Sequence, residues 1–307
     1  MVRVTRFKCG PICIVLACRH HVADGIGQIF FFNSWARLGS RLELEIQPFH
    51  DRTMILSPRD PIQVEFRHLE HEPPLPPLCS TGEMATTVES TFKLTKDQID
   101  ALKLQAINAQ AQQVPSYNST STPHMNACKA RGLGVGDRSQ SIKLYIPTDG
   151  RSRLNDVDLP QGYFGNLTFF TGCIAQASEI TDKPLWYAAS KVHEALNKVK
   201  EVGYLRSAID YLESQSDITN FVRGARSTTS PNLSINSWHR IPFNQADFGW
   251  GSPKCIRHGG IRNEGQSFLV QSLEGDGSVL LQINLLKCHM PLFEDHFYNL
   301  VGSIPKL

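Results

Sequence analysis

The feature that most constrains the fold of this chain is a junction at which an apolar β segment gives way to a helix. Cys13–Ala17 is uninterrupted apolar sequence, and a helix is expected to begin at Asp24 or Gly25. The apolar face of that helix is formed by Ile26, Ile29, Phe30 and Phe31. The connecting residues read His20-His21-Val22-Ala23-Asp24-Gly25. The junction therefore indicates an α/β unit that carries a histidine and a carboxylate between its two parts.

Other helices are marked by caps and by apolar periodicity. Thr95 and Gln98 form a capping box, which predicts a helix start at this point. Pro184 opens a helix that is expected to run to about Val199. Two more helices are marked by the apolar groups Leu205, Ile209, Leu212 and Phe293, Phe297, Leu300. By contrast, the stretch 116–126 is polar and broken by proline, so a loop is expected there.

Further β segments follow from alternating apolar residues. The stretch 2–17 is expected to form two short strands separated at Gly10-Pro11. Residues 141–147 alternate Ile142, Leu144 and Ile146 with Lys143 and Tyr145, which predicts a strand buried on one face. Residues 166–175 are predicted to form another strand. Residues 267–273 and 278–285 flank Asp276-Gly277, which is the signal of a β-hairpin.

Length and a proline-rich stretch indicate two domains. A chain of 307 residues exceeds the usual size of one domain. Between residues 52 and 78 there is no clean period, and the prolines are Pro58, Pro61, Pro73, Pro74, Pro76 and Pro77. Such sequence is typical of a stiff connector. The predicted division is a first domain at 1–54, a connector at 55–85 and a second domain at 86–307, in the α/β class with mixed sheets.

Composition argues against several classes of function. A formal net charge of +2 with scattered basic residues gives no electrostatic basis for a nucleic-acid or membrane partner. The eight cysteines include no Cys-x-x-Cys pair, and the stretch 1–10 lacks the apolar core of a secretory leader. We therefore expect free thiols and a cytoplasmic, monomeric protein.

His20 is the candidate catalytic base. Histidine has an ordinary pKa of about 6.5, and a positioned base typically contributes about 10² to 10⁴ in rate. Asp24, four residues on, could orient the imidazole as in a catalytic triad. His20, His21 and Asp24 could alternatively bind zinc, but no third ligand stands at useful spacing, so no metal is predicted. His21 is expected to be an ordinary polar residue.

A second motif, Asp247-Phe248-Gly249-Trp250-Gly251, lies far away in the sequence. It contains no obvious nucleophile or base. Its glycines allow backbone conformations that other residues avoid, and Phe248 and Trp250 are expected to pack firmly. A structural role is therefore predicted for the whole motif.

Together, the two motifs resemble the signature sequences of the plant BAHD acyltransferases, which transfer an acyl group from coenzyme A to a hydroxyl or an amine. The resemblance covers nearly the whole chain and is strongest to the hydroxycinnamoyl-CoA:shikimate/quinate hydroxycinnamoyltransferases. It is carried also by residues 49–53, 59–61, 128–133, 144–151, 162–166, 186–190, 204–213 and 221–240. It implies a two-domain chloramphenicol-acetyltransferase-like fold, a coenzyme A thioester as co-substrate, and no bound cofactor.

The resemblance also implies roles for single residues around the base. His20 is expected to deprotonate the acceptor hydroxyl, and Trp238 to donate a hydrogen bond to the tetrahedral oxyanion, with core packing as the alternative for Trp238. Asp24 is expected to turn away from His20 and to pair with an arginine that holds the loop. Arg151 is favoured over Arg153 as that arginine.

Acceptor binding is expected from two other positions. Arg223, in the segment 222–225, matches a family arginine that holds the acceptor carboxylate, which suits the paired donors of a guanidinium. Asn236 stands where the family has a threonine that bonds an acceptor hydroxyl. The residues that bind coenzyme A are left open.

Two further departures from the family pattern bear on function. The family's chain begins well before the position that matches Met1, so an N-terminally truncated chain with an incomplete first domain is expected. The stretch 116–127 is also shorter than in the family. The leading hypothesis is transfer of a p-coumaroyl or caffeoyl group to shikimate or quinate. The alternatives are an inactive remnant that still binds a ligand or partner, and a transferase for a different alcohol or amine.

Overall fold

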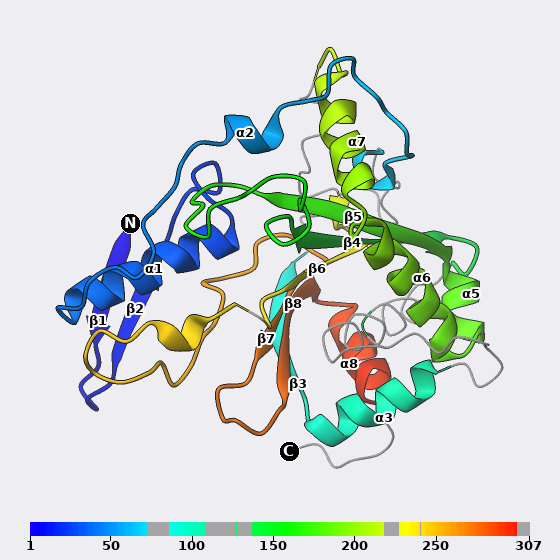
Figure 1. The fold of residues 1–307 in the computed structure, drawn as a ribbon. Helices are drawn as coiled ribbons and strands as arrows, with labels where there is room; N and C mark the ends of the chain where they lie inside the picture. Colours follow the sequence, from blue (N-terminus) through cyan, green and yellow to red (C-terminus); the bar gives the residue numbers. More distant parts are fainter. Residues whose placement is uncertain (73–85, 108–126, 128–136, 218–226, 240, 300–307) are drawn as a thin grey trace. The chain divides into compact units, whose positions relative to one another are not determined.

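The protein is described by a computed structural model that covers residues 1–72, 86–107, 127, 137–217, 227–239 and 241–299 (Figure 1). Its internal contacts divide the chain into two compact units. Unit 1 consists of Met1–Ser57, Asp149–Thr168 and Ile241–Gly259, and unit 2 of Pro58–Thr148, Phe169–Arg240 and Gly260–Leu307. Both units are assembled from segments that are distant in sequence. The division into 1–54, 55–85 and 86–307, which follows chain order, stays a prediction.

Unit 1 contains a small antiparallel ribbon and one long helix. The ribbon pairs β1 (Val2–Arg6) with β2 (Ile12–Leu16), so the two strands predicted around Gly10-Pro11 are confirmed. Helix α1 (Gly25–Gly39) begins at the predicted place, because Asp24 is its N-cap and accepts a hydrogen bond from the Gly27 amide. The short helices α2 (Thr53–Leu56) and η4 (Phe243–Gln245) belong to the same unit.

Unit 2 is built on a six-stranded mixed sheet, which confirms the predicted α/β class with mixed sheets. The strand order is β3 (Thr87–Leu94), β8 (Val279–Leu286), β7 (Gln266–Gln271), β6 (Leu233–Ser237), β4 (Ser141–Asp149) and β5 (Thr168–Gln176). Strand β6 runs parallel to β4 and β7, whereas β8 runs antiparallel to β7 and β3. The β7–β8 pair is the hairpin predicted at Asp276-Gly277. The sequence analysis did not identify β3 or β6.

The main core of the protein lies in unit 2, between the sheet and three helices (Figure 1). These are α3 (Lys96–Ala106), α6 (Leu185–Lys198) and α8 (Met290–Asn299). The core side chains include Ile99, Leu102, Val192, Leu281, Ile283, Phe293 and Phe297. Helix α3 starts with the predicted capping box, since the Thr95 hydroxyl and the Gln98 side chain each bond the other's backbone. Helices α5 (Ala177–Asp182) and α7 (Val202–Glu213) complete the unit.

One prediction about strand β4 is wrong. The alternation of Lys143 and Tyr145 with apolar residues indicated a strand with one wet face, yet Lys143 and Tyr145 are only 1% and 2% exposed. Both faces of β4 are therefore covered. The Lys143 ammonium donates to the backbone carbonyls of Leu69 and Glu72 and lies over the Tyr145 ring, so its charge is solvated by the protein instead of by water.

The connector of unit 2 is held by a buried polar network. His68 is the N-cap of the one-turn helix η1 (Leu69–His71), and Glu70 lies within that helix. The Tyr204 hydroxyl of α7 donates to both oxygens of Glu70 at 2.9 and 2.8 Å. The His68 ring lies 2.9 Å from Glu70 Oε1 through Nδ1 and 3.0 Å from the Ser207 hydroxyl through Nε2. Ser207, His68 and Glu70 are hydrogen-bonded in the same sequence of side chains, hydroxyl to imidazole to carboxylate, as the catalytic triad of a hydrolase. All three are buried, so they hold the connector and are closed to a substrate.

Candidate functional site

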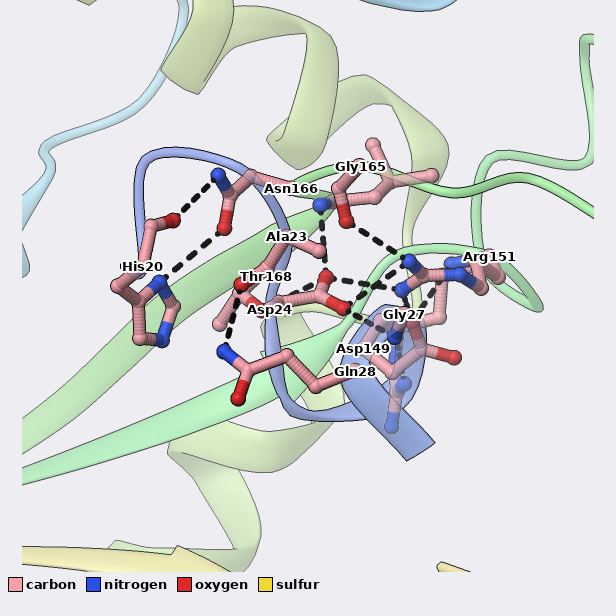
Figure 2. Close-up of polar contacts among 12 residues, drawn as sticks. His20, Ala23, Asp24, Gly27, Gln28, Asp149, Arg151, Gly165, Asn166 and Thr168 are labelled. Carbon is pink, nitrogen blue, oxygen red and sulfur yellow. Dashed lines mark hydrogen bonds and ion pairs between the residues drawn. The ribbon is translucent and has the colours of Figure 1, made fainter. Parts of the chain in front are cut away.

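His20 lies in the segment between β2 and α1 and is exposed to solvent. Its partner is Asn166, which is 146 residues away in sequence (Figure 2). The Asn166 side-chain amide donates to the His20 backbone carbonyl at 2.7 Å, and Asn166 Oδ1 lies 3.1 Å from His20 Nδ1. One asparagine therefore holds both the main chain and the ring of the candidate base.

The two bonds together fix which ring nitrogen of His20 carries the proton. The backbone carbonyl can only accept, so the Asn166 NH₂ group must face it, and Oδ1 is the atom left to face the ring. Since Oδ1 is also an acceptor, Nδ1 must be the protonated nitrogen. Nε2 has no hydrogen-bond partner among the described residues. In its neutral form the imidazole therefore has its free lone pair on Nε2.

Asp24 does not orient His20; its hydrogen bonds go elsewhere (Figure 2). The Arg151 guanidinium binds it through two parallel bonds of 2.9 and 3.0 Å. Backbone amides of Gly27 and Leu167 donate to it at 2.9 and 2.8 Å, and the Thr168 hydroxyl at 3.2 Å. Five donors on two oxygens leave no lone pair for a distant ring. The carboxylate is thus the fixed point that joins the start of α1 to the segment before β5.

The charge state of Asp24 follows from these contacts. Burial by itself raises the pKa of this carboxyl, but the bonds from Arg151 and from the Gly27 amide outweigh it and hold the pKa below its usual value. Arg151 is the arginine that was favoured as the partner. It also donates to Asp149 at 2.8 Å and to the Gly165 carbonyl at 3.1 Å. Arg153 instead donates to the backbone carbonyl of Asp149.

The segment 162–166, which supplies Asn166, is locked to the residues around Phe49. The Phe49 amide donates to the Gly162 carbonyl, and the Phe164 amide donates to the Phe49 carbonyl. A Cβ at Gly162 would lie 1.9 Å from the Gln47 carbonyl oxygen, so only glycine fits there. Sequence reasoning assigned no role to Asn166. The signal that could have found it is a polar amide at the end of a glycine–aromatic stretch shared with the resembled family.

The second motif is a tight turn built on its own aspartate. Asp247 Oδ1 accepts from the backbone amides of Gly249, Trp250 and Gly251 at 2.7, 2.9 and 2.9 Å. This turn requires φ values of 91° at Gly249 and 94° at Gly251, which glycine adopts easily. The Ser40 hydroxyl, at the C-cap of α1, donates to the Asp247 carbonyl at 2.9 Å. The motif is therefore tied to the far end of the helix that Asp24 begins.

The two aromatic residues of this motif behave differently. Phe248 packs edge-on against Trp35 and Phe32 of α1, with ring centroids 4.8 and 5.5 Å apart. Trp250 stacks on Phe248 at 6.1 Å but remains 66% exposed, so the expectation that it packs firmly is wrong. The motif thus clamps α1 through Phe248 and the Asp247 turn. Helix α1 therefore contacts both sequence motifs: Asp24 of the first motif caps its start, and Phe248 of the second motif packs against its C-terminal half.

The remaining predicted site residues lie in unit 2 or outside the described residues. On β6, Asn236 is half-buried and donates through its amide to the Ser267 carbonyl at 3.1 Å. Just after β6, the Trp238 ring packs edge-on against Phe268 at 4.7 Å, and its backbone amide donates to the Leu269 carbonyl. Arg223 lies outside the described residues. The roles of Asn236, Trp238 and Arg223 stay predictions.

The described residues were also considered as a metal site, a membrane span and a ligand pocket. No group of three or more histidine, cysteine or acidic side chains there could hold a metal ion. No helix in the same part of the chain is long and apolar enough to cross a bilayer. A small apolar hollow in unit 2 contains none of the predicted site residues; it is lined by Ile142, Leu144, Cys173, Ala175, Ile180, Ala188, Lys191 and Val192. Burial there raises the pKa of the Cys173 thiol to about 12, so it is an unreactive thiol.

Two plant acyltransferases are similar to this chain along nearly its whole length. Shikimate O-hydroxycinnamoyltransferase of Nicotiana tabacum is 45% identical over 310 residues, which cover 97% of this chain and 69% of the tobacco protein. Anthranilate N-benzoyltransferase protein 3 of Dianthus caryophyllus is 39% identical, over 97% of this chain and 67% of its own length. The chain therefore spans about two thirds of the length of these relatives.

Solved structures show the same fold at lower identity. Vinorine synthase matches 98% of this chain and 66% of its own chain with a TM-score of 0.71 at 20% identity. TRI101 of F. sporotrichioides, solved in complex with coenzyme A and T-2, matches 95% of this chain and 67% of its own with a TM-score of 0.72 at 17% identity. The model of the Transferase family matches residues 1–300. With its histidine motif, its glycine–aromatic motif and this match over almost its whole length, the chain belongs to the Transferase family, the BAHD acyltransferases.

Proposed function

We propose that this chain carries the catalytic base of an acyl-CoA-dependent acyltransferase, and that the transferred group is a hydroxycinnamoyl group. The observation that supports it most directly is the pairing of His20 with Asn166, which leaves Nε2 of the imidazole as a free base. A neutral alcohol is a poor nucleophile, so direct attack on a thioester needs a base of this kind. The name of the tobacco relative supports the hydroxycinnamoyl donor.

The proposed reaction balances with His20 as the only proton carrier. Nε2 takes the proton of the acceptor hydroxyl as its oxygen forms a bond to the thioester carbonyl carbon. The tetrahedral intermediate then expels the coenzyme A sulfur, which receives the proton from the imidazolium and leaves as a thiol. Trp238 is proposed to stabilise the oxyanion, and no acyl-enzyme is needed because the thioester is already activated.

The acceptor is proposed to be a small molecule that carries a carboxylate beside its nucleophile. The relatives are named for shikimate and for anthranilate, and both compounds carry a carboxylate. We propose that Arg223 binds this group. Anthranilate is an amine that also carries a carboxylate, so Arg223→Ala should impair transfer to both shikimate and anthranilate. Tyramine, an amine that lacks the carboxylate, is the comparison that distinguishes this role.

Shikimate is the favoured acceptor within this class. Asn236 uses its amide for the Ser267 carbonyl, which leaves its Oδ1 to accept from a hydroxyl. An acceptor with ring hydroxyls fits this better than anthranilate does. The alternative is a protein that binds these ligands without turning them over, and the thiol-release assay distinguishes it from an active transferase.

The test is thiol release from p-coumaroyl-CoA in the presence of shikimate or anthranilate. We expect turnover with shikimate that His20→Ala abolishes. His21→Ala is the matched control, since His21 is the adjacent exposed histidine and should be dispensable. A folded chain that releases no thiol with either acceptor, or equal activity in both histidine variants, would contradict the proposal.

A further inference from the structure

Two side chains of α7 hold the connector of unit 2 through its backbone amides. The amides of Arg59 and Gln63 donate to the Asp210 carboxylate at 2.8 and 3.1 Å. Burial raises the pKa of this carboxyl, but the bonds from Arg59 outweigh it and hold the pKa below its usual value, so Asp210 stays charged in mild acid. Ser207, the other side chain, lies three residues earlier on the same face of α7. We call these two points the Asp210 anchor and the Ser207 anchor.

The Ser207 anchor differs from the Asp210 anchor because its oxygen belongs to a hydroxyl. The amides of Glu65 and Phe66 donate to Ser207 Oγ at 3.0 and 3.2 Å. A hydroxyl oxygen has two lone pairs and one proton, so these two amides use both lone pairs. The proton is left for the third contact of Oγ, which is Nε2 of His68 at 3.0 Å. Nε2 must therefore accept, and the anchor is complete while Nε2 carries no proton.

The other ring nitrogen of His68 faces a carboxylate. Nδ1 lies 2.9 Å from Glu70 Oε1. Burial raises the pKa of Glu70, but the bonds from His68 and Tyr204 outweigh it, so this carboxyl is ionised and can only accept. Nδ1 therefore carries a proton, which suits both the neutral ring and the imidazolium. The contact with Ser207 suits the neutral ring alone, so His68 is neutral while the Ser207 anchor is intact.

Charged and titratable groups surround the His68 ring from three elements. They are Arg67, Glu70, His71 and Glu72 from the connector, Tyr204 and Tyr211 from α7, and Lys143 from β4. Glu72 is paired with Arg67, and the Lys143 ammonium is bonded to backbone carbonyls of the connector. Glu70 bonds the ring itself, so its negative charge balances a second proton on the imidazole. That proton, on Nε2, would make three donors compete for the two lone pairs of Ser207.

We propose that His68 makes the Ser207 anchor sensitive to protons: protonation of Nε2 releases the Glu65 and Phe66 amides from Ser207, while the Asp210 anchor continues to hold the connector. The connector is thus a segment with one fastening that persists in mild acid and one that opens. All of these residues belong to unit 2, and none of them is placed in the candidate site. The inference goes beyond the proposed acyl transfer and does not depend on it.

Amide hydrogen exchange of the unmodified chain, followed by NMR, measures both anchors at once. Protection factors are compared between about pH 7.5 and about pH 5.5, a range that covers the ordinary titration of histidine. We expect the protection factors of the Glu65 and Phe66 amides to fall about tenfold, roughly the effect of one lost hydrogen bond. Those of Arg59 and Gln63 should change less than about twofold, since the Asp210 anchor stays intact.

The variant His68→Gln tests the role of the ring. Glutamine offers an amide oxygen to the Ser207 hydroxyl and gains no proton in this pH range, so protection at the Ser207 anchor should no longer depend on pH. His71→Gln is the matched control, because His71 is the neighbouring histidine of the connector and stacks on Tyr211. It should keep the pH dependence of the unmodified chain.

Three results would overturn the proposal: protection factors that fall equally at both anchors, protection at the Ser207 anchor that does not change with pH, and a pH dependence that persists in His68→Gln. The comparison of the two anchors uses the unmodified chain, so it decides the question even where a variant does not fold. Exchange is measured without acyl-CoA. A chain that releases no thiol but shows this titration would thus refute the proposed function and leave this inference intact.

Discussion

Asn166 holds His20 through two contacts. Its side-chain amide donates to the His20 backbone carbonyl at 2.7 Å, and its Oδ1 lies 3.1 Å from His20 Nδ1. In a catalytic triad this position is held by a carboxylate, which orients the base and also stabilises the imidazolium electrostatically. An amide supplies the orientation and the tautomer without the charge. The contact therefore selects the tautomer that, in the neutral ring, has its lone pair on Nε2, which is the arrangement that the proposed base requires.

Asn166→Ala should lower kcat by roughly tenfold to a hundredfold with little change in stability, because a mispositioned base loses about that much rate. Asn166→Asp should keep an acceptor at Nδ1 but place a carboxylate against the His20 carbonyl. We expect its activity profile to shift to higher pH, since a negative charge raises the pKa of the imidazole. ¹⁵N chemical shifts of the neutral His20 ring should show a protonated Nδ1 and an unprotonated Nε2 in the unmodified chain. A neutral ring with its proton on Nε2 would refute the assigned tautomer.

Asp24→Asn should destabilise the chain by about 2–3 kcal/mol, because it removes the carboxylate that pairs with two nitrogens of the buried Arg151 guanidinium and leaves only Asp149 as its charged partner. Asp24 is 1% exposed, so water cannot replace the lost interaction. Arg151→Lys should lie between the unmodified chain and Asp24→Asn, since it keeps the charge and loses the paired geometry. Arg153→Ala is the control, as Arg153 is a neighbouring arginine that donates to the Asp149 backbone carbonyl. Urea unfolding measures all of these, and equal losses for Arg153→Ala and Asp24→Asn would count against the pair.

The Glu70 network should make stability depend on acid pH. Burial raises the pKa of Glu70, but the bonds from His68 and Tyr204 outweigh it and keep the pKa below its ordinary value. The unfolded chain therefore binds this proton at higher pH than the folded chain does. Its contribution is present above about pH 4.3 and is lost as the pH falls through the lower folded value.

Glu70→Gln should accordingly cost about 1–3 kcal/mol at pH 7 and flatten the loss of unfolding free energy between pH 5 and pH 3. The matched control is Glu65→Gln, whose side chain is 51% exposed. Its pH dependence should follow the unmodified chain. Denaturant midpoints across this range provide the measurement, and identical slopes for Glu70→Gln and Glu65→Gln would argue against the network.

Alanine substitutions of the two aromatic residues of the second motif should lower the free energy of unfolding by different amounts. Phe248→Ala removes a ring packed on Trp35 and Phe32 and should cost roughly 2 kcal/mol, below the range for fully buried rings because Phe248 is half-buried. Trp250→Ala should change stability by less than about 0.5 kcal/mol, as expected at an exposed site. Thermal unfolding of both variants tests this. A larger loss of stability in Trp250→Ala than in Phe248→Ala would show that Phe248 is not the residue that stabilises α1.

Local features of this chain were readable from its sequence. The N-cap at Asp24, the capping box at Thr95 and Gln98, and the hairpin at Asp276-Gly277 each depend on residues close together along the chain, and each is present in the structure. The histidine motif and its family were also accessible, because they are written in contiguous residues. Arg151 as the partner of Asp24 followed from the family resemblance alone.

Tertiary structure decided what depends on segments brought together from afar. The alternation in β4 could not reveal that both its faces are covered, and so misplaced Lys143 and Tyr145. Nothing near His20 in the sequence points to Asn166, which reaches it because the segment 162–166 is bonded to the backbone at Phe49 and Asp24 and to the Arg151 side chain. The sequence determines which local backbone conformations are low in free energy. Packing between distant segments determines which polar groups lose water, and hence which side chains must find one another.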